Sequence, residues 1–379
     1  MGGTAAEEHL VHGMGTALEA PTWPAITDAE AAKVLTYFPE AGQFQGLAWH
    51  SPRPFSSATR VQTDRGQFFL KRHHCDVRTP HALAEEQAFM THLQSKGVPV
   101  PEVVQTVDGL GAVSLGNWTY ELQRKAPGLD LYQDRQSWTP YLKPAHADAA
   151  GSALGLLHRA AQDYQASERG PHRLVASFTI LPARDPLAAA AAYVAARPAL
   201  AAFLSDKPWR DELTRLFATF GGGLAERLEG QPALWTHNDW HPSNLLWATD
   251  GSVSAVFDFG LAGPTCAVHD LATAIERAVI PWLEIAEGDE NASPDINAAR
   301  GILAGYQREM PLDTELLVRL LPLVHLEFAL SEVDYFAGVV GDRDQADLAW
   351  QGYAIGHADW FRSAAGQGFM DQLAHWAAA

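Results

Sequence analysis

The alternation of apolar and polar residues predicts a strand-rich segment near the beginning of the chain. Thr59 to Asp64 and Gln67 to Arg72 are rich in β-branched and aromatic residues, and Asp64-Arg65-Gly66 supplies the chemistry of a hairpin turn between them. A second hairpin is predicted where Asp108-Gly109 separates residues 103–105 from residues 112–114. Strands therefore dominate from about residue 47 to about residue 122.

One helix is expected between the two hairpins. Thr79 can cap its N-terminus, and Pro80 suits its first turn. Gly97 can close the helix in a left-handed conformation, and Pro99 cannot continue it. The small strand-rich part is thus predicted to carry one main helix.

The pattern becomes mostly helical from about Ser137 to the end of the chain. The exception is residues 232–261, which are typical of short strands around loops. We therefore predict a loose arm over residues 1–25, a small β-rich lobe over 26–124 and a larger helical lobe over 125–379.

Composition supports two lobes and narrows the range of partners. A chain of 379 residues is too long for one compact core. It contains 45 acidic and 27 basic residues, and its net charge of −18 repels nucleic acid and anionic membrane surfaces. Only two cysteines are present, which matches a reducing compartment. The acidic N-terminus does not resemble a signal peptide, and the most aliphatic stretch is interrupted. We therefore expect a cytoplasmic protein without a membrane partner.

Polar groups concentrate in a segment between the short strands of the helical part. The sequence HNDWHPSN occupies residues 237–244, and FDFG follows at 257–260. Phosphoryl transfer requires a carboxylate that orients the acceptor hydroxyl, together with oxygen ligands for Mg²⁺. Asp239 suits the first role, and Asn244 and Asp258 suit the second.

These two motifs together resemble the catalytic and metal-binding loops of the aminoglycoside phosphotransferase and choline kinase family. The residues HDLA at 269–272 are similar to the beginning of the next helix in that family. The resemblance extends over about residues 45 to 340 and implies an α+β, bilobal, protein-kinase-like fold that uses ATP and Mg²⁺. Asn238 departs from the family pattern, which usually has glycine before the catalytic aspartate.

The resemblance also implies a lysine on a small-lobe strand and a glutamate on the following helix. Lys71 ends a predicted strand and is the candidate for the α and β phosphates. At 100° per residue, Glu86 lies within the apolar stripe of the helix, whereas Glu85 points toward its edge. Because a carboxylate in an apolar face requires a partner, we expect Glu86 to pair with Lys71 and Glu85 to be solvated.

Further nucleotide contacts follow from the same resemblance. Ser56 and Ser57 lie where antibiotic kinases have a serine-bearing loop over the phosphates. Residues 120–128 resemble the strand and linker between the lobes, so the carbonyl of Arg124 and the N–H of Ala126 are expected to contact the base.

Several polar residues have both a structural and a functional interpretation. His237 and His158 are expected to support the fold, and the family match suggests that Asp270 hydrogen-bonds the catalytic loop. His241 is a candidate substrate contact, although a structural role is favoured. Glu327 and Asp334 share one face of a late helix and are candidates for holding a cationic substrate, although such a face is more often simply solvated.

The leading hypothesis is an ATP- and Mg²⁺-dependent kinase of a small hydroxylated molecule, with Asp239 as the catalytic residue. Amino alcohols, homoserine-like compounds and aminoglycoside-like compounds are the acceptors considered, and the negative charge favours one that bears an amine. The alternatives are a bacterial Ser/Thr protein kinase of the stress-response type and a catalytically silent pseudokinase. A metallohydrolase built on His237, Asp239 and His241 is disfavoured, because no HExxH motif accompanies them.

Overall fold

A computed structural model describes residues 9–166, 169–289 and 291–377. The chain forms two compact units. Unit 1 comprises residues 1–84, 101–126 and 132–136, and unit 2 comprises residues 85–100, 127–131 and 137–379. No single helix within the described ranges is long and apolar enough to cross a membrane.

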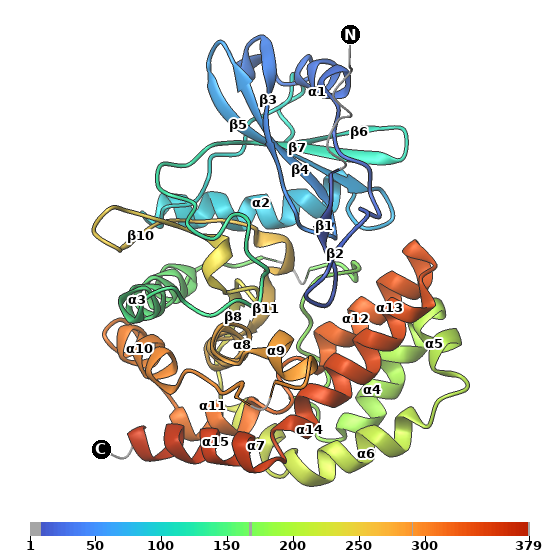
Figure 1. Cartoon of the computed structure of the whole chain (residues 1–379), viewed down its shortest axis with the longest axis vertical. Helices are drawn as coiled ribbons and strands as arrows, with labels where there is room; N and C mark the ends of the chain where they lie inside the picture. Colours follow the sequence, from blue (N-terminus) through green and yellow to red (C-terminus); the bar gives the residue numbers. More distant parts are fainter. Residues whose placement is uncertain (1–8, 167–168, 290, 378–379) are drawn as a thin grey trace. The chain divides into compact units, whose positions relative to one another are not determined.

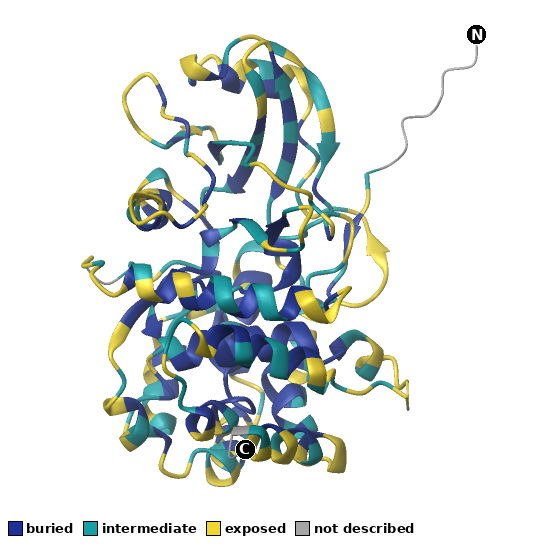
Figure 2. Cartoon of the chain, turned by 90° about the vertical axis from the view of Figure 1, so that its left-hand side faces the viewer, coloured by how far each residue is buried: buried dark blue, intermediate teal, exposed yellow. Residues whose placement is uncertain are grey.

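Unit 1 is built on a five-stranded antiparallel sheet with the strand order β3-β4-β5-β7-β6 (Figure 1). Buried and half-buried residues alternate along β4, so one face of the strand lies against the core (Figure 2). Its elements are β1 (Val11–His12), β2 (Leu18–Glu19), α1 (Asp28–Leu35), a 3₁₀ turn (Pro39–Ala41), β3 (Phe44–His50), β4 (Ser57–Thr63), β5 (Gly66–His74), β6 (Ala112–Leu115) and β7 (Trp118–Arg124).

The first predicted hairpin is confirmed, whereas the second is wrong. Thr63 pairs with Gly66, so a two-residue turn joins β4 to β5. Strand β6 pairs instead with β7 through a turn that contains Gly116 at φ +60°. Residues 103–105 contribute only a single bridge, Val103 to Gln123. The Asp108-Gly109 turn exists, but Gly116 supplies the conformation that folds β6 onto β7.

The described part of the predicted N-terminal arm is anchored to the sheet rather than loose. Strands β1 and β2 pair, and the N–H of His12 donates to the carbonyl of Pro52. Further along, Arg72 donates to Glu30 of α1 at 2.7 Å, and Tyr120 donates to the same carboxylate at 2.8 Å. Residues 1–8 lie outside the described residues.

Helix α2 (Pro80–Ser95) forms as its terminal signals predict. The N–H of Ala82 donates to Thr79 Oγ1 at 3.2 Å, and Gly97 adopts φ +84°. Glu86 is buried on this helix.

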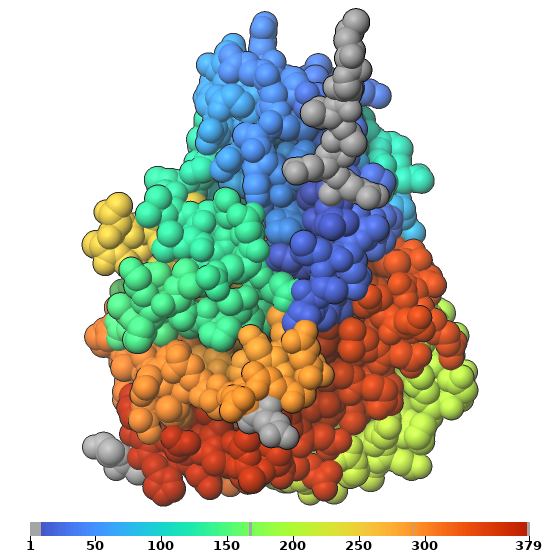
Figure 3. All heavy atoms as spheres, in the orientation of Figure 1, coloured from blue at the N-terminus to red at the C-terminus, as the bar shows by residue number. Residues whose placement is uncertain are grey.

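Unit 2 is mainly helical. Helices α3 and α10 pack closely where Gly151 and Gly305 lie, and α15 packs on α10 and α11 (Figure 3, red and orange). The α-helices of unit 2 that follow α2 are α3 (Pro144–Ala161), α4 (Pro186–Ala195), α5 (Pro198–Leu204), α6 (Trp209–Phe220), α7 (Leu224–Glu229), α8 (Ala267–Val279), α9 (Trp282–Ala286), α10 (Ile296–Gln307), α11 (Thr314–Leu320), α12 (Leu326–Tyr335), α13 (Arg343–Asp347), α14 (Ala358–Trp360) and α15 (Ala364–Ala377). Its strands are β8 (Ala233–Thr236), β9 (Leu245–Trp247), β10 (Val253–Val256) and β11 (Gly263–Cys266). It also contains two π-helical segments (Phe336–Val340 and Leu348–His357) and short 3₁₀ turns at Pro242–Asn244 and Phe259–Leu261.

Candidate active site

Two pairs of short antiparallel strands position the polar motifs of unit 2. Strand β8 pairs with β11, and β9 pairs with β10. The HNDWHPSN segment connects β8 to β9, and Asp258 lies between β10 and the following 3₁₀ turn. Both polar motifs thus begin where a buried strand ends, as the sequence predicted.

The backbone conformation of Asn238 explains why the family pattern usually has glycine at this position. Its φ is +60°, in the left-handed region that glycine adopts without strain and asparagine tolerates. The side chain accepts from Thr236 Oγ1 at 2.9 Å, and its Nδ2 lies 3.3 Å from the carbonyl oxygen of Leu261. These bonds hold Asn238 in place, so the departure from the family pattern preserves the loop geometry.

Asp270 anchors the HNDWHPSN loop from the first turn of α8. Its carboxylate accepts the N–H of His237 at 2.9 Å and the N–H of Asn238 at 2.7 Å. His158 Nε2 lies 2.9 Å from the same carboxylate, and His158 Nδ1 lies 2.8 Å from the hydroxyl of Tyr306. The structural interpretations of Asp270 and His158 are confirmed.

Asp239 is a partly buried carboxylate surrounded by donors. Arg277 of α8 donates to Oδ1, and the side-chain amide of Asn244 donates to Oδ2 at 3.0 Å. His241 Nε2 lies 3.4 Å from Oδ1. Although burial opposes ionisation, Arg277 and His241 hold the pKa of Asp239 far below its ordinary value. Asp239 is therefore an ionised acceptor of hydrogen bonds rather than a strong base.

Asn244 and Asp258 approach one another because their strands pair. Val256 pairs with Leu245, and the N–H of Phe257 donates to the carbonyl of Asn244 at 3.1 Å. Asp258, the next residue, has φ +58°, which turns the chain there. The Nδ2 group of Asn244 is occupied by Asp239, which leaves the amide oxygen as a ligand. An amide oxygen and a carboxylate are suitable ligands for Mg²⁺.

The two histidines of the loop contact the loop itself. His237 Nε2 lies 3.0 Å from the carbonyl oxygen of Phe257, and its Nδ1 accepts the N–H of Asp239 at 3.2 Å. The expected supporting role of His237 is thereby confirmed. His241 is buried, and its Nδ1 lies 2.8 Å from the hydroxyl of Ser243.

Arg169 pairs with Glu86 and was not identified from the sequence. Its guanidinium lies 2.5 Å from the Glu86 carboxylate and donates to the carbonyls of Gly260 and Ala262. Arg169 thereby connects α2 to the turn that follows Asp258. Glu85 was expected to be solvated, but it is half-buried and lies 3.0 Å from His172 Nε2, because residues 169–173 pack beside α2.

The candidate nucleotide residues of unit 1 lie on the sheet and at its end. Lys71 is on β5 opposite Glu121, and Arg124 ends β7 opposite Phe68. Ala126 ends the segment of unit 1 that comprises residues 101–126. The pairing of Lys71 with Glu86 connects residues of different units and stays a prediction.

The two serines of unit 1 differ. Ser57 begins β4 and is buried, and its hydroxyl lies 2.9 Å from the carbonyl oxygen of Pro24 and 3.2 Å from the Arg72 guanidinium. Ser56 precedes the strand and is half-buried. These contacts give the Ser57 hydroxyl a structural role, so only Ser56 stays among our proposed phosphate contacts.

Glu327 and Asp334, the candidate substrate acids of α12, bind the chain itself. Glu327 accepts the N–H groups of Thr179 and Ile180 at 2.9 and 2.7 Å. Asp334 lies 2.8 Å from Arg173 and accepts the N–H of Leu200 at 3.2 Å. Both side chains are buried, unlike the solvated face that the spacing favours. They hold residues 173–200 in place, and we remove them from the proposed acceptor contacts.

The chain matches the model of the phosphotransferase enzyme family (APH) over residues 54–312, which is more than half of its length. It is 27% identical to a homoserine kinase from Caulobacter sp. (strain K31) over 293 residues, which cover 76% of this chain and 79% of that protein. It is also 27% identical to an uncharacterized protein from Deinococcus radiodurans over 299 residues, 77% of this chain and 76% of that one.

Solved structures agree in fold. A microcompartment-associated aminopropanol kinase aligns with a TM-score of 0.56 and 18% identity over 89% of this chain and 98% of that one. An amicoumacin kinase in complex with AMP-PNP, Ca²⁺ and Ami aligns with a TM-score of 0.53 and 16% identity over 91% of each chain. The chain thus shares its fold with these kinases.

The chain belongs to the phosphotransferase enzyme family. It has the protein-kinase-like fold and is a small-molecule kinase.

Proposed function

We propose that this protein transfers the γ-phosphoryl group of ATP to a hydroxyl of a small molecule, with Asp239 as the catalytic residue. The observation that carries the proposal is the contact of Asn244 with Asp239, which Arg277 keeps ionised, on a loop whose following strand pairs with the strand before Asp258. An ionised carboxylate attracts the acceptor hydroxyl and orients its oxygen toward the phosphorus. It receives the hydroxyl proton late, because the transition state is loose and requires little base strength.

The remaining residues position the nucleotide. Asn244 and Asp258 supply oxygen ligands to Mg²⁺, which when bound neutralises charge on the phosphates. Lys71, paired with Glu86, contacts the α and β phosphates, and Ser56 contributes a hydroxyl to the phosphates. The Arg124 carbonyl and the Ala126 N–H contact the base. A cytoplasmic location stays a prediction, in keeping with the free thiols of Cys75 and Cys266.

The acceptor is proposed to be a small alcohol that bears an amine. The net charge of −18 attracts cations, and similar proteins include a homoserine kinase and an aminopropanol kinase. His241, buried beside Asp239, is the residue of this region that we propose to approach the acceptor.

Asp239→Asn tests the proposed mechanism with little change of shape. Turnover of Mg-ATP is measured with homoserine, 3-aminopropanol and aminoglycosides as acceptors. We expect a loss of at least about a hundredfold in kcat, because the variant can neither accept the proton nor hold the hydroxyl as a charged acceptor does. Asp250→Asn, at an exposed turn where the Asp250 carboxylate accepts hydrogen bonds from Ser252, is the matched control.

Equal turnover by Asp239→Asn and the wild type would reject the role of Asp239. Binding of Mg-ATP with no transfer to any small acceptor would instead support a silent pseudokinase, and transfer to protein serine residues alone would support a protein kinase.

A further inference from the structure

A group of metal-binding side chains lies in unit 2 beyond the proposed phosphate-transfer residues. Glu276 is on α8, His325 immediately precedes α12, and His357 ends the π-helical segment Leu348–His357. Their side chains are 1%, 4% and 8% exposed. These three residues, here named the Glu276 cluster, come from elements about 50 and 30 residues apart in sequence, so only the tertiary fold brings them together.

The donor atoms of the Glu276 cluster face one another. His357 Nδ1 lies 2.7 Å from Glu276 Oε1, and His325 Nδ1 lies 3.5 Å from Glu276 Oε2. One donor atom from each residue lies within 4.8 Å of the other two. Two imidazole nitrogens and a carboxylate form a donor set typical of Zn²⁺ and unlike the all-oxygen set that suits Mg²⁺.

Three buried polar atoms of this region make no close hydrogen bond. Glu276 Oε2 has the His325 ring at 3.5 Å, and His325 Nε2 and Glu332 Oε2 lie 3.8 Å apart. Buried polar groups are normally paired, because desolvation without a partner is costly. None of the three atoms is reached by solvent, so an occupant must be small and must bind directly between the side chains.

Two buried carboxylates in this region also favour the binding of a cation. Glu276 and Glu332 place two carboxylates in the interior, and the nearby Arg277 is already paired with Asp239. A divalent cation bound between these side chains would compensate both carboxylates.

The surroundings resemble those that orient metal ligands. Metal-binding histidines commonly direct their second ring nitrogen at a carboxylate, and His325 Nε2 lies 3.8 Å from Glu332. The ring of Trp282 stacks on His357 at 3.7 Å, and its Nε1 donates to the carbonyl of Glu276 at 2.9 Å. Trp138 meets the edges of the His325 and His357 rings. An apolar wall around such a group excludes water and strengthens coordination.

We propose that Glu276, His325 and His357 bind a zinc-like divalent cation at a structural site that joins α8 to the segments around His325 and His357. This site is separate from the Mg²⁺ proposed for the nucleotide. Since Arg277 follows Glu276 in α8, a fixed Glu276 also fixes the residue that contacts Asp239.

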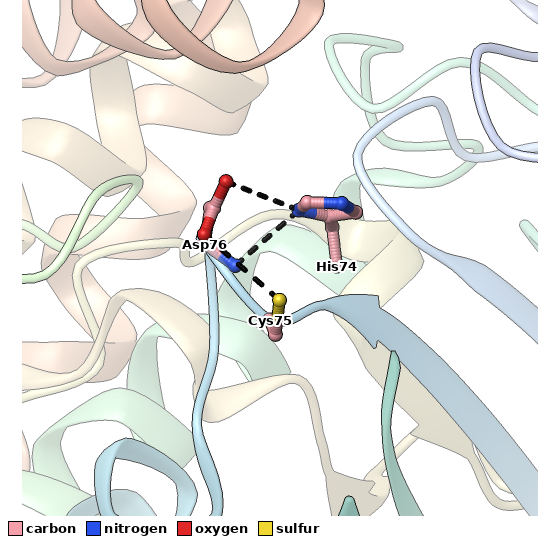
Figure 4. Close-up of side chains that lie close together, drawn as sticks. All are labelled: His74, Cys75 and Asp76. Atoms are coloured by element: carbon pink, nitrogen blue, oxygen red, sulfur yellow. Dashed lines mark hydrogen bonds and ion pairs between the residues drawn. The ribbon is translucent and has the colours of Figure 1, made fainter. Parts of the chain in front are cut away.

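His74, Cys75 and Asp76 are a second group of residues that could bind a metal ion, and they lie next to one another in one turn (Figure 4). His74 Nδ1 accepts the N–H of Asp76 at 3.3 Å, and Cys75 Sγ lies 3.9 Å from the Asp76 carboxylate. Its donors are consecutive in the chain and Asp76 is exposed, so it serves as the control location.

The test uses the full chain without a histidine tag. The protein is stripped with dipicolinate, dialysed and titrated with Co²⁺, followed by Zn²⁺. We expect one equivalent of Co²⁺ to give the visible d–d absorption of a low-coordinate site with nitrogen ligands, which Zn²⁺ then abolishes. We also expect Zn²⁺ to raise the melting temperature. Binding at oxygen ligands alone gives only a weak band, which distinguishes the nucleotide site.

Variants locate the ion. His325→Gln and His357→Gln should each weaken Co²⁺ binding by at least about tenfold, and Glu332→Gln by about tenfold through the orientation of His325. Cys75→Ser and His146→Gln, a buried histidine outside the cluster, should bind as the wild type does. Circular dichroism of the stripped variants checks folding.

The proposal is overturned if the wild type gives no strong Co²⁺ band, a result that needs no variant. It is equally overturned if the band persists in the His325→Gln, His357→Gln double variant or disappears in Cys75→Ser.

Discussion

Arg277 places a permanent positive charge on the carboxylate that we expect to meet the acceptor hydroxyl. It is buried on α8, its guanidinium contacts Asp239, and it lies 4.8 Å from the centre of the Phe328 ring. The aromatic ring and the carboxylate keep the guanidinium in one orientation. At the scale of single residues, Arg277 therefore contributes most to keeping Asp239 ionised, and His241 acts in the same direction.

Replacing Arg277 with Met should change the pH dependence of the reaction. Asp239 must be ionised to orient the hydroxyl, and loss of the neighbouring cation raises its pKa. Since the wild-type pKa of Asp239 lies far below its ordinary value, we expect an acid limb due to Asp239 to enter the measurable range of the kcat/KM profile only in the variant. Arg277→Lys should raise the pKa of Asp239 less. The exposed Arg362, paired with Asp359, supplies the control Arg362→Met. A kcat/KM profile of Arg277→Met without this acid limb would contradict the role of Arg277.

His269 should make stability sensitive to acid. Its ring is buried beside Phe178, its Nδ1 has no hydrogen-bond partner, and burial lowers its pKa to about 4. Because the folded-state pKa lies below the unfolded value of about 6.5, the neutral ring stabilises the protein above pH 6.5, and this contribution is lost as pH falls through about 4.

In His269→Phe, the unfolding free energy should decrease less as the pH falls than it does in the wild type. The two decreases should differ by up to about 3 kcal/mol. Urea unfolding between about pH 7 and about pH 4.5 measures the difference. The exposed His375→Asn should retain the wild-type slope. Parallel slopes for the wild type and His269→Phe would exclude the effect.

At the scale of elements, the approach of α3 to α10 depends on the absence of side chains. A Cβ added at Gly305 would lie 2.0 Å from the carbonyl oxygen of Asp148, and one at Gly151 would lie 2.0 Å from the carbonyl oxygen of Ile302. These contacts are with backbone atoms, which cannot rotate away. Helix α3 also carries His158, so this packing positions the support of Asp270.

Gly305→Ala should therefore destabilise the protein by about 1 to 3 kcal/mol, although alanine favours helix more than glycine does. The matched control is Gly368→Ala in α15, where an added Cβ meets nothing within 4 Å and should stabilise by up to about 1 kcal/mol. Thermal unfolding compares the two variants. A melting temperature that rises in both would show that the helices can separate at no cost.

At the scale of the whole molecule, the charge of −18 affects binding of ATP and of the acceptor in opposite directions. ATP is an anion, so local donors and Mg²⁺ must attract it against the overall field. An ammonium group is attracted by the same field.

Salt should consequently raise the KM for an amine acceptor and leave that for a neutral sugar alcohol unchanged, because ions screen the attraction over about 10 Å at 0.1 M. Initial rates over a salt series at saturating Mg-ATP provide the measurement. Equal salt dependence of both acceptors would argue against recognition of an amine by the field of the protein.

The sequence by itself determined the features that depend on a few neighbouring residues. The β4–β5 turn, both ends of α2, and the order of Lys71, Asp239, Asn244 and Asp258 could all be read from local patterns. Turn chemistry, helix caps and the five-residue step from Asp239 to Asn244 act within one loop or one turn of helix, so their signals lie close together in the chain.

Only the tertiary structure decided which distant polar groups meet. Helical periodicity places Arg277 and Glu276 in an amphipathic helix, but nothing local indicates that one contacts Asp239 and the other His325 and His357. The same holds for Arg169 with Glu86 and for Glu327 with residues 179–181. A buried charge must find a compensating partner, yet its partner is selected by the packing of whole helices, which spacing along the chain does not encode.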